Sequence, residues 1–229
     1  MPIGFVHHRP GLRRRARGAT PHAMLKVIRY VSLALSVLLL AAGGYLWWQR
    51  GSIDPQSVLG GMSVPPGVTL GGPFELLDQT GRAVTDRDFR GRPMLIFFGF
   101  THCPDVCPTE LQVFAEVLEK LGPRASLLAP IFISIDPERD TPEVMANYVA
   151  LFDPRIIGLT GTPDQVAAVA RAYRVFYAKV TPPGASGYVM DHSSFSYLIG
   201  PDGGFRALFR YGTAPEEIAR AVAAVLPAG

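Results

Sequence analysis

The chain has 229 residues, of which 48% are hydrophobic, and carries 22 lysines and arginines against 19 aspartates and glutamates. This length suits one domain with an appendage, or two small domains. Residues 1–50 hold eight basic residues and no acidic one, whereas residues 51–229 hold 14 basic and 19 acidic residues, a net charge of −5. An acidic body of this kind repels phosphate backbones, so we exclude nucleic acid as a partner.

The first predicted element is a transmembrane helix at residues 30–48, which contain no charged side chain. Roughly 20 apolar residues in a helix cross the hydrocarbon core of a bilayer. Tyr30, Trp47 and Trp48 stand at the ends of the span, where aromatic rings favour the interface. More basic residues precede the span than follow it, which predicts a cytoplasmic N-terminus. We therefore expect a basic cytoplasmic tail at 1–29, a single-pass anchor in the inner membrane, and a periplasmic domain.

Two alternatives concern this N-terminal region. A cleaved signal peptide is one, but the apolar run is longer than a usual signal core, and the small residues 41–44 are followed by further apolar residues. The other is a start at Met24, which gives a more compact anchor. Residues 49–72 are rich in Gly, Pro and Ser, and this composition predicts a linker.

Residues 73–229 show alternating strand and helix patterns. The run 93–100 is apolar on both faces, as expected for a buried central strand. A helix is predicted from Pro108, since proline suits the first helical position, to Leu121, before Gly122 and Pro123. The other predicted strands are 74–77, 129–135, 156–159, 194–199 and 205–211, and the other predicted helices are 141–152, 162–173 and 214–226.

This order predicts an α/β fold with a mostly parallel central sheet, extended by an antiparallel hairpin and flanked by helices. We interpret it as a thioredoxin-like fold with an extra N-terminal β-hairpin, preceded by one transmembrane helix. The stretch 178–190, which contains Pro182, Pro183 and Gly184, is expected to be a mobile loop.

The only two cysteines, Cys103 and Cys107, lie in the loop between the buried strand and the helix predicted at Pro108. The helix N-terminus favours a thiolate at Cys107. The spacing lets both sulfur atoms point the same way, to close a disulfide or to hold one soft cation. A purely structural disulfide around so short a loop would remove little chain entropy. The thioredoxin redox motif has two residues between its cysteines rather than three, but redox chemistry stays open.

His192 is the second candidate, because it precedes a strand that should run beside the one ending at Phe100. That placement brings its imidazole to the sheet edge where the cysteines lie. Two thiolates and one imidazole suit copper in either common oxidation state, whereas zinc normally takes a fourth ligand or a water. Asp191 is expected to orient the ring from the second coordination shell. His102 is interpreted as an exposed or loop-packing residue and Met190 as filling a strand.

Three segments together resemble the Sco/SenC family of copper-assembly proteins of cytochrome c oxidase. The first is residues 98–109, Phe-Gly-Phe-Thr-His-Cys-Pro-Asp-Val-Cys-Pro-Thr, and the second is residues 134–142, Ser-Ile-Asp-Pro-Glu-Arg-Asp-Thr-Pro. The third comprises Asp-His-Ser-Ser at 191–194 with Tyr-Leu-Ile-Gly-Pro-Asp-Gly at 197–203. The resemblance extends over about residues 71–226, and its long first segment is far more specific than the cysteine spacing alone.

The resemblance implies that one copper ion, Cu(I) or Cu(II), is bound by Cys103, Cys107 and His192. It also implies a role in building the dinuclear copper centre of cytochrome c oxidase subunit II at the outer face of a respiratory membrane, together with other copper-delivery proteins. Some family members are thought instead to reduce the cysteines of that subunit.

Two functions therefore stand side by side, a copper metallochaperone and a membrane-anchored thiol–disulfide oxidoreductase. The second would use Cys107 as the nucleophile and Cys103 as the resolving cysteine, and would not need His192. A third, peroxide reduction, would call for an arginine near the thiolate, and none lies in the cysteine loop.

Overall fold

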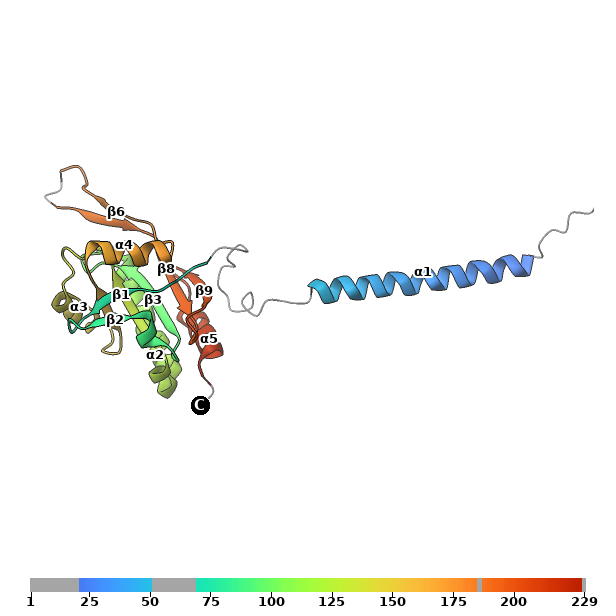
Figure 1. Ribbon diagram of the computed structural model, residues 1–229, viewed down its shortest axis with the longest axis horizontal. Coiled ribbons are helices and arrows are strands. Elements are labelled where there is room, and N and C mark those ends of the chain that lie inside the picture. The colour runs from blue at the N-terminus through green and yellow to red at the C-terminus, as the bar shows by residue number, and fades with distance from the viewer. Residues whose placement is uncertain (1–20, 51–68, 185–186, 228–229) are drawn as a thin grey trace, which may run out of the picture. The chain divides into compact units, whose positions relative to one another are not determined.

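The computed structural model describes residues 21–50, 69–184 and 187–227 (Figure 1). The chain divides into two compact units, Met1–Ile53 and Asp54–Gly229. Most of the predicted basic tail and most of the predicted linker lie outside the described residues. The structure therefore leaves those two boundaries as predictions.

The N-terminal unit contains helix α1, Pro21–Arg50. Within it, Leu25–Gly43 has a mean hydropathy of 1.9 over 19 residues, and its side chains are exposed. Ser36 donates its hydroxyl to the carbonyl of Ser32 inside the helix, so this polar group needs no outside partner. The helix is long and apolar enough to cross a membrane, and the predicted span 30–48 lies within it.

The second unit is built on a seven-stranded mixed sheet with the order β2-β1-β5-β4-β3-β8-β9. β3 and β5 both pair parallel with β4, and the remaining neighbours are antiparallel. The strands are β1 Glu75–Asp78, β2 Ala83–Thr85, β3 Met94–Gly99, β4 Ala129–Ser134, β5 Ile157–Thr160, β8 Phe195–Ile199 and β9 Phe205–Arg210. The mixed sheet and the extra N-terminal hairpin, β1–β2, confirm the predicted fold class, but the expectation of a mostly parallel sheet was wrong, because only the two pairings of β4 are parallel.

In the described part of this unit, four α-helices accompany the sheet: α2 Val106–Leu121, α3 Pro142–Val149, α4 Pro163–Ala172 and α5 Pro215–Val225. α2 packs against α5, and α3 packs against β5. The two Thr-Pro starts form caps as expected, since the hydroxyls of Thr141 and Thr162 each accept a backbone N–H from the first turn. Every residue of β3 and β4 is buried, and for β3 the apolar run at 93–100 predicted this.

Two elements differ from the sequence-based expectation. Helix α2 begins at Val106 rather than Pro108, so Cys107 lies inside its first turn. The expected mobile loop at 178–190 contains two paired strands, β6 Tyr177–Val180 and β7 Val189–His192 (Figure 1). The short strands around Pro182 and Pro183 carry no strong alternation of their own, and their pairing arises from cross-strand contacts that a single strand does not reveal.

Candidate metal centre

Cys103, Cys107 and His192 form a cluster in which the sulfur atoms and one ring nitrogen all lie within 4.8 Å of one another. Sγ of Cys107 lies 3.7 Å from Nε2 of His192. The residues come from the loop after β3, the first turn of α2 and the end of β7. The structure thus brings together the three residues that the sequence singled out, although 85 positions separate Cys107 from His192.

The sheet explains this convergence. β3 and β8 are antiparallel neighbours, with Phe97 opposite Ser196, so the chain just before β8 lies beside the carboxyl end of β3. His192 occupies that position and the cysteine loop leaves from the same end. Gly99, the last residue of β3, has no side chain, and Sγ of Cys107 approaches the space where one would stand. The position of the cluster is therefore set by the strand order and by the close approach of the Cys107 sulfur to the backbone of Gly99.

The imidazole of His192 is held by two rings and one carbonyl. Phe97 and Phe100 contact it edge-on, each with ring centroids 6.0 Å away. Its Nδ1 lies 3.0 Å from the carbonyl oxygen of Ser193. With Nδ1 protonated and donating to that carbonyl, the lone pair of Nε2 faces the sulfur atoms, as a metal ligand requires.

The role expected of Asp191 is corrected by this contact. Neighbouring residues of β7 face opposite sides of the strand, and the Asp191 side chain is exposed whereas that of His192 is half-buried. The carbonyl of Ser193 takes the orienting position instead. Sequence reasoning missed Ser193 because any residue type carries the same backbone carbonyl.

The two thiols differ strongly. Cys107 is fully buried, while Cys103 is half-buried and accepts the backbone N–H of Cys107 at 3.4 Å. The hydrogen bond from the Cys107 thiol, with further ones from the backbone N–H groups of Asp105 and Cys107, lowers the pKa of Cys103 to about 3. The same contact with Cys103, together with burial, raises the pKa of Cys107 far above its ordinary value.

These contacts favour a thiolate on Cys103 over one on Cys107, the position that the predicted start of the helix suggested. Because α2 begins one residue before Cys107, that side chain points into the core, and the free N–H groups of the first turn reach Cys103 instead. Both thiols are free rather than joined in a disulfide.

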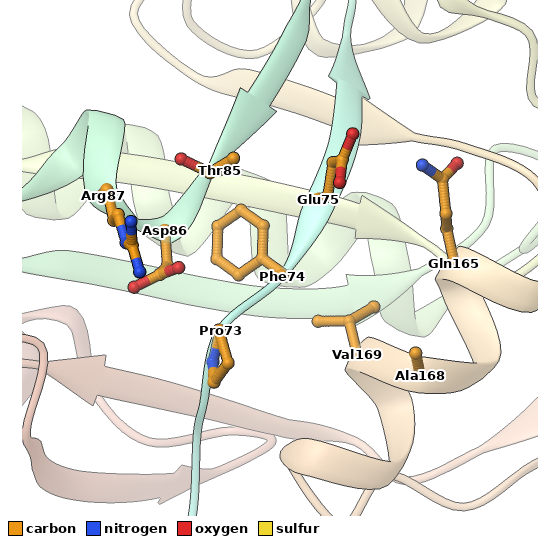
Figure 2. A pocket seen from close by; sticks show the side chains of 9 residues that line it. All are labelled: Pro73, Phe74, Glu75, Thr85, Asp86, Arg87, Gln165, Ala168 and Val169. Carbon is orange, nitrogen blue, oxygen red and sulfur yellow. The ribbon is translucent and has the colours of Figure 1, made fainter.

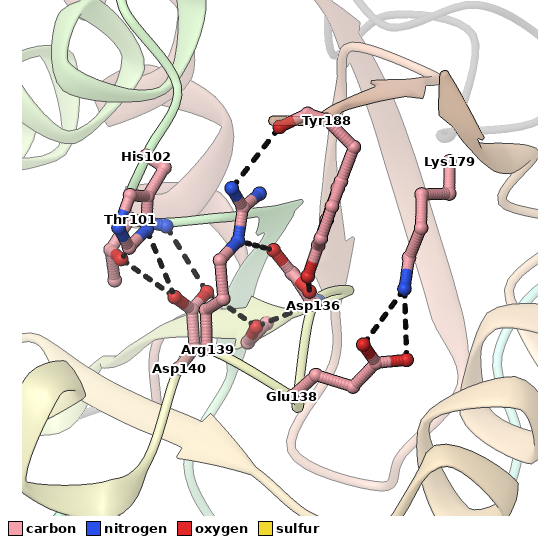
Figure 3. A network of polar contacts seen from close by, with 9 residues as sticks. Thr101, His102, Asp136, Glu138, Arg139, Asp140, Lys179 and Tyr188 are labelled. Atoms are coloured by element: carbon pink, nitrogen blue, oxygen red, sulfur yellow. Dashed lines mark hydrogen bonds and ion pairs between the residues drawn. The ribbon is translucent and has the colours of Figure 1, made fainter. Parts of the chain in front are cut away.

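The cysteine loop is fastened by a buried carboxylate (Figure 3). Asp140, fully buried, accepts the backbone N–H of Thr101 at 3.1 Å and its hydroxyl at 2.6 Å. Asp140 also accepts the hydroxyl of Ser134 at 2.6 Å. His102 is exposed and its Nδ1 lies 3.9 Å from the same carboxylate, while Met190 is buried in β7. Asp140 was not among the residues predicted from the sequence, although it lies in the second of the three resemblance segments.

The donor set fits a soft metal of low coordination number. A metal–sulfur bond of about 2.3 Å and a metal–nitrogen bond of about 2.0 Å, separated by roughly 120°, place the two ligand atoms about 3.7 Å apart. The Sγ–Nε2 distance of 3.7 Å between Cys107 and His192 matches this value. The three side chains could therefore hold one metal ion without large movement.

The domain also contains a cavity that is separate from this metal site. It has a volume of about 510 Å³ and lies between β1, the segment around Asp86 and helix α4 (Figure 2). Its lining includes Phe74 and Val169, and its buried carboxylate, Asp86, is paired with Arg90 at 2.9 Å. It shares no residue with the cysteine–histidine cluster.

Comparison with known proteins agrees with this geometry. Residues 64–227 match the SCO1/SenC family model. The chain is 50% identical to human mitochondrial SCO1 homolog over 67% of this chain and 52% of that protein. It is 42% identical to SenC of Rhodobacter capsulatus over 69% of this chain and 72% of that protein. The chain spans little more than half the length of the human and mouse relatives.

Among solved structures, ScoI of Bradyrhizobium japonicum with copper bound is 50% identical and superposes with a TM-score of 0.64. The match covers 69% of this chain and 99% of that one.

Proposed function

Because the chain belongs to the SCO1/SenC family, we propose that it is a copper metallochaperone that binds one copper ion between Cys103, Cys107 and His192. The bound copper ion would be used to assemble the dinuclear copper centre in cytochrome c oxidase subunit II. The observation that carries this proposal is the clustering of two sulfur atoms and one imidazole nitrogen within 4.8 Å, in a protein similar to a copper-bound ScoI.

The two cysteines would have different tasks in delivery. Cys103 is half-buried and its hydrogen bonds lower its pKa, so it can take up copper first and yield it to an attacking ligand of an acceptor. Cys107 is buried and protonated, so it binds only after losing its proton. A site with one open ligand and one buried ligand can retain copper in transit and still exchange it.

The decisive measurement is copper content and thiol titration of the reduced protein, compared with Cys103→Ser, Cys107→Ser and His192→Ala. We expect one copper per wild-type chain and a large loss of affinity in each variant. The His192→Ala protein should keep two titratable thiols and still form a disulfide. If it binds one copper as tightly as the wild type, the three-ligand site is wrong.

One observation favours the second candidate function, a thiol–disulfide oxidoreductase acting on the same oxidase subunit. A half-buried, accessible Cys103 beside a buried Cys107 is the arrangement of an attacking and a resolving thiol. A stabilised thiolate, however, stabilises the reduced pair and makes it a weaker reductant. Reduction of a disulfide-bonded peptide of the subunit at an unchanged rate by His192→Ala would favour this candidate over copper delivery.

We further propose that the protein is a single-pass inner-membrane protein with a cytoplasmic N-terminus and a periplasmic domain, supplied by other copper-delivery proteins. The support is helix α1, whose apolar segment follows a strongly basic stretch. Protease treatment of intact spheroplasts should digest a C-terminal tag and spare an N-terminal one. The reverse result would exclude this orientation.

A further inference from the structure

The β6–β7 hairpin carries His192, but strand pairing does not join it to the seven-stranded sheet. A cavity of about 460 Å³ lies between the hairpin, the segment 135–138 and helix α4. The hairpin therefore rests on the domain through side-chain contacts rather than through a continuous backbone ladder. Those contacts act on the position of His192 together with Phe97, Phe100 and the carbonyl of Ser193.

Strand β7 presents one side to the domain. Tyr188, just before the strand, and then Met190 and His192 are half-buried or buried, whereas Val189 and Asp191 between them are exposed. Tyr188 and His192 are four residues apart, which is about 13 Å along an extended strand. Fixing Tyr188 thus fixes the far end of the strand that terminates at the ligand.

Tyr188 is held by Arg139 and Asp136 (Figure 3). Nη1 of Arg139 donates to the carbonyl oxygen of Tyr188 at 3.1 Å, and its guanidinium carbon lies 3.9 Å from the centre of the tyrosine ring. Nε of Arg139 donates to Asp136, and the hydroxyl of Tyr188 donates to the same carboxylate at 2.8 Å. These three residues, which we call the Arg139 latch, form a closed ring of contacts between the hairpin and the segment after β4.

The same segment also reaches the other half of the metal centre. The guanidinium carbon of Arg139 is 5.9 Å from the ring centre of Phe100, and that ring packs edge-on against His192. The next residue, Asp140, holds the cysteine loop through Thr101. Asp136 is 2% exposed, so removing its cationic partner leaves a buried carboxylate without an ion pair.

We propose that Arg139 is a positioning residue of the metal centre, which holds the β6–β7 hairpin down through Tyr188 and so keeps Nε2 of His192 within reach of the sulfur atoms. Opening the latch would free the imidazole and leave a site of two sulfur ligands, which holds copper less tightly. The copper readout of this inference rests on the proposed function, whereas its conformational readout does not.

The conformational test is backbone amide exchange of the full-length, reduced, metal-free protein in detergent micelles. Arg139→Gln should speed exchange at residues 187–192 by about tenfold or more, and leave β3 and β4 unchanged. Glu138→Gln is the matched control. Glu138 adjoins Arg139 and pairs with Lys179 of the same hairpin at 2.8 Å, but the pair is exposed, so its loss should leave the exchange rates unchanged.

The copper test measures Cu(I) affinity by competition with a chromophoric chelator. Arg139→Gln should weaken binding about tenfold in the wild-type background and leave the affinity of His192→Ala unchanged, because Arg139 acts through His192. Tyr188→Phe removes only the hydroxyl bond to Asp136, and a smaller acceleration of exchange at the same residues is expected. It keeps the inference testable if Arg139→Gln does not fold.

Three outcomes are distinguishable. Wild-type exchange rates and affinity in both Arg139→Gln and Tyr188→Phe would overturn the latch. An equal loss of affinity with and without His192 would also overturn it, because the effect would then be general destabilisation. Fast exchange at 187–192 in Arg139→Gln, with no copper bound by the wild type, would support the latch and reject the proposed function.

Discussion

A methyl group on Gly99 would lie 2.6 Å from Sγ of Cys107, closer than such atoms approach in proteins. It would also lie 2.7 Å from the ring of Phe132, which is fully buried and cannot withdraw to solvent. The end of β3 and the first turn of α2 therefore fit together only without a side chain at this position.

Gly99→Ala is accordingly expected to displace Cys107, lower copper affinity and reduce the free energy of unfolding by about 1–3 kcal/mol, the usual cost of overpacking. Denaturant unfolding and chelator competition check both effects. Gly187→Ala is the control, because nothing lies within 4 Å of the added carbon. Equal behaviour of the two variants would show that the contact with Cys107 has no consequence.

Alkylation should distinguish the two thiols. In the reduced, metal-free protein at pH 6, iodoacetamide is expected to modify Cys103 at least about tenfold faster than Cys107, because only Cys103 is both accessible and deprotonated. Peptide mass spectrometry after timed quenching gives the two rates. Faster labelling of Cys107 would show that the thiolate forms at Cys107, as the sequence predicted.

Copper affinity should depend on pH with the slope of a single proton. Cys103 is already a thiolate, whereas Cys107 must lose its proton on binding, so uptake releases one proton and binding strengthens as pH rises. Between pH 7 and 8.5, Cu(I) affinity is expected to rise about tenfold per pH unit. A hundredfold rise per unit would mean that both thiols are protonated in the metal-free protein.

Disulfide formation should release the cargo. Both sulfur ligands are consumed when Cys103 and Cys107 join, which leaves only the imidazole of His192. Equilibrium dialysis of oxidised and reduced protein against the same copper concentration should find copper only in the reduced sample. Equal retention by the two forms contradicts the proposed coupling between redox state and copper release.

Much of the domain could be predicted because the structure that the local sequence favours is also the structure that forms in the folded domain. The apolar run through Ile96 and Phe97 became a buried central strand, and Thr141 and Thr162 became helix caps. His192 was found near the cysteines because strand order alone brings it to the end of β3. These features depend on periodicity and topology, which the sequence displays directly.

The features that were missed depend on exact geometry. A two-residue shift in the start of α2 decides which cysteine receives the free N–H groups, and boundaries of this kind are poorly encoded in local sequence. The partner of the His192 ring is the carbonyl of Ser193 rather than the acidic side chain beside it. The pairing of β6 with β7 joins two segments that carry no strong pattern separately.

The separation of the β6–β7 hairpin from the main sheet has a consequence for how such a protein can diversify. The pairing that forms the hairpin carrying His192 is separate from the ladder of the seven-stranded sheet, whereas Cys103 and Cys107 are held by β3 and α2. Substitutions in the hairpin can therefore change how His192 is held while the strand pairing of the main sheet stays intact.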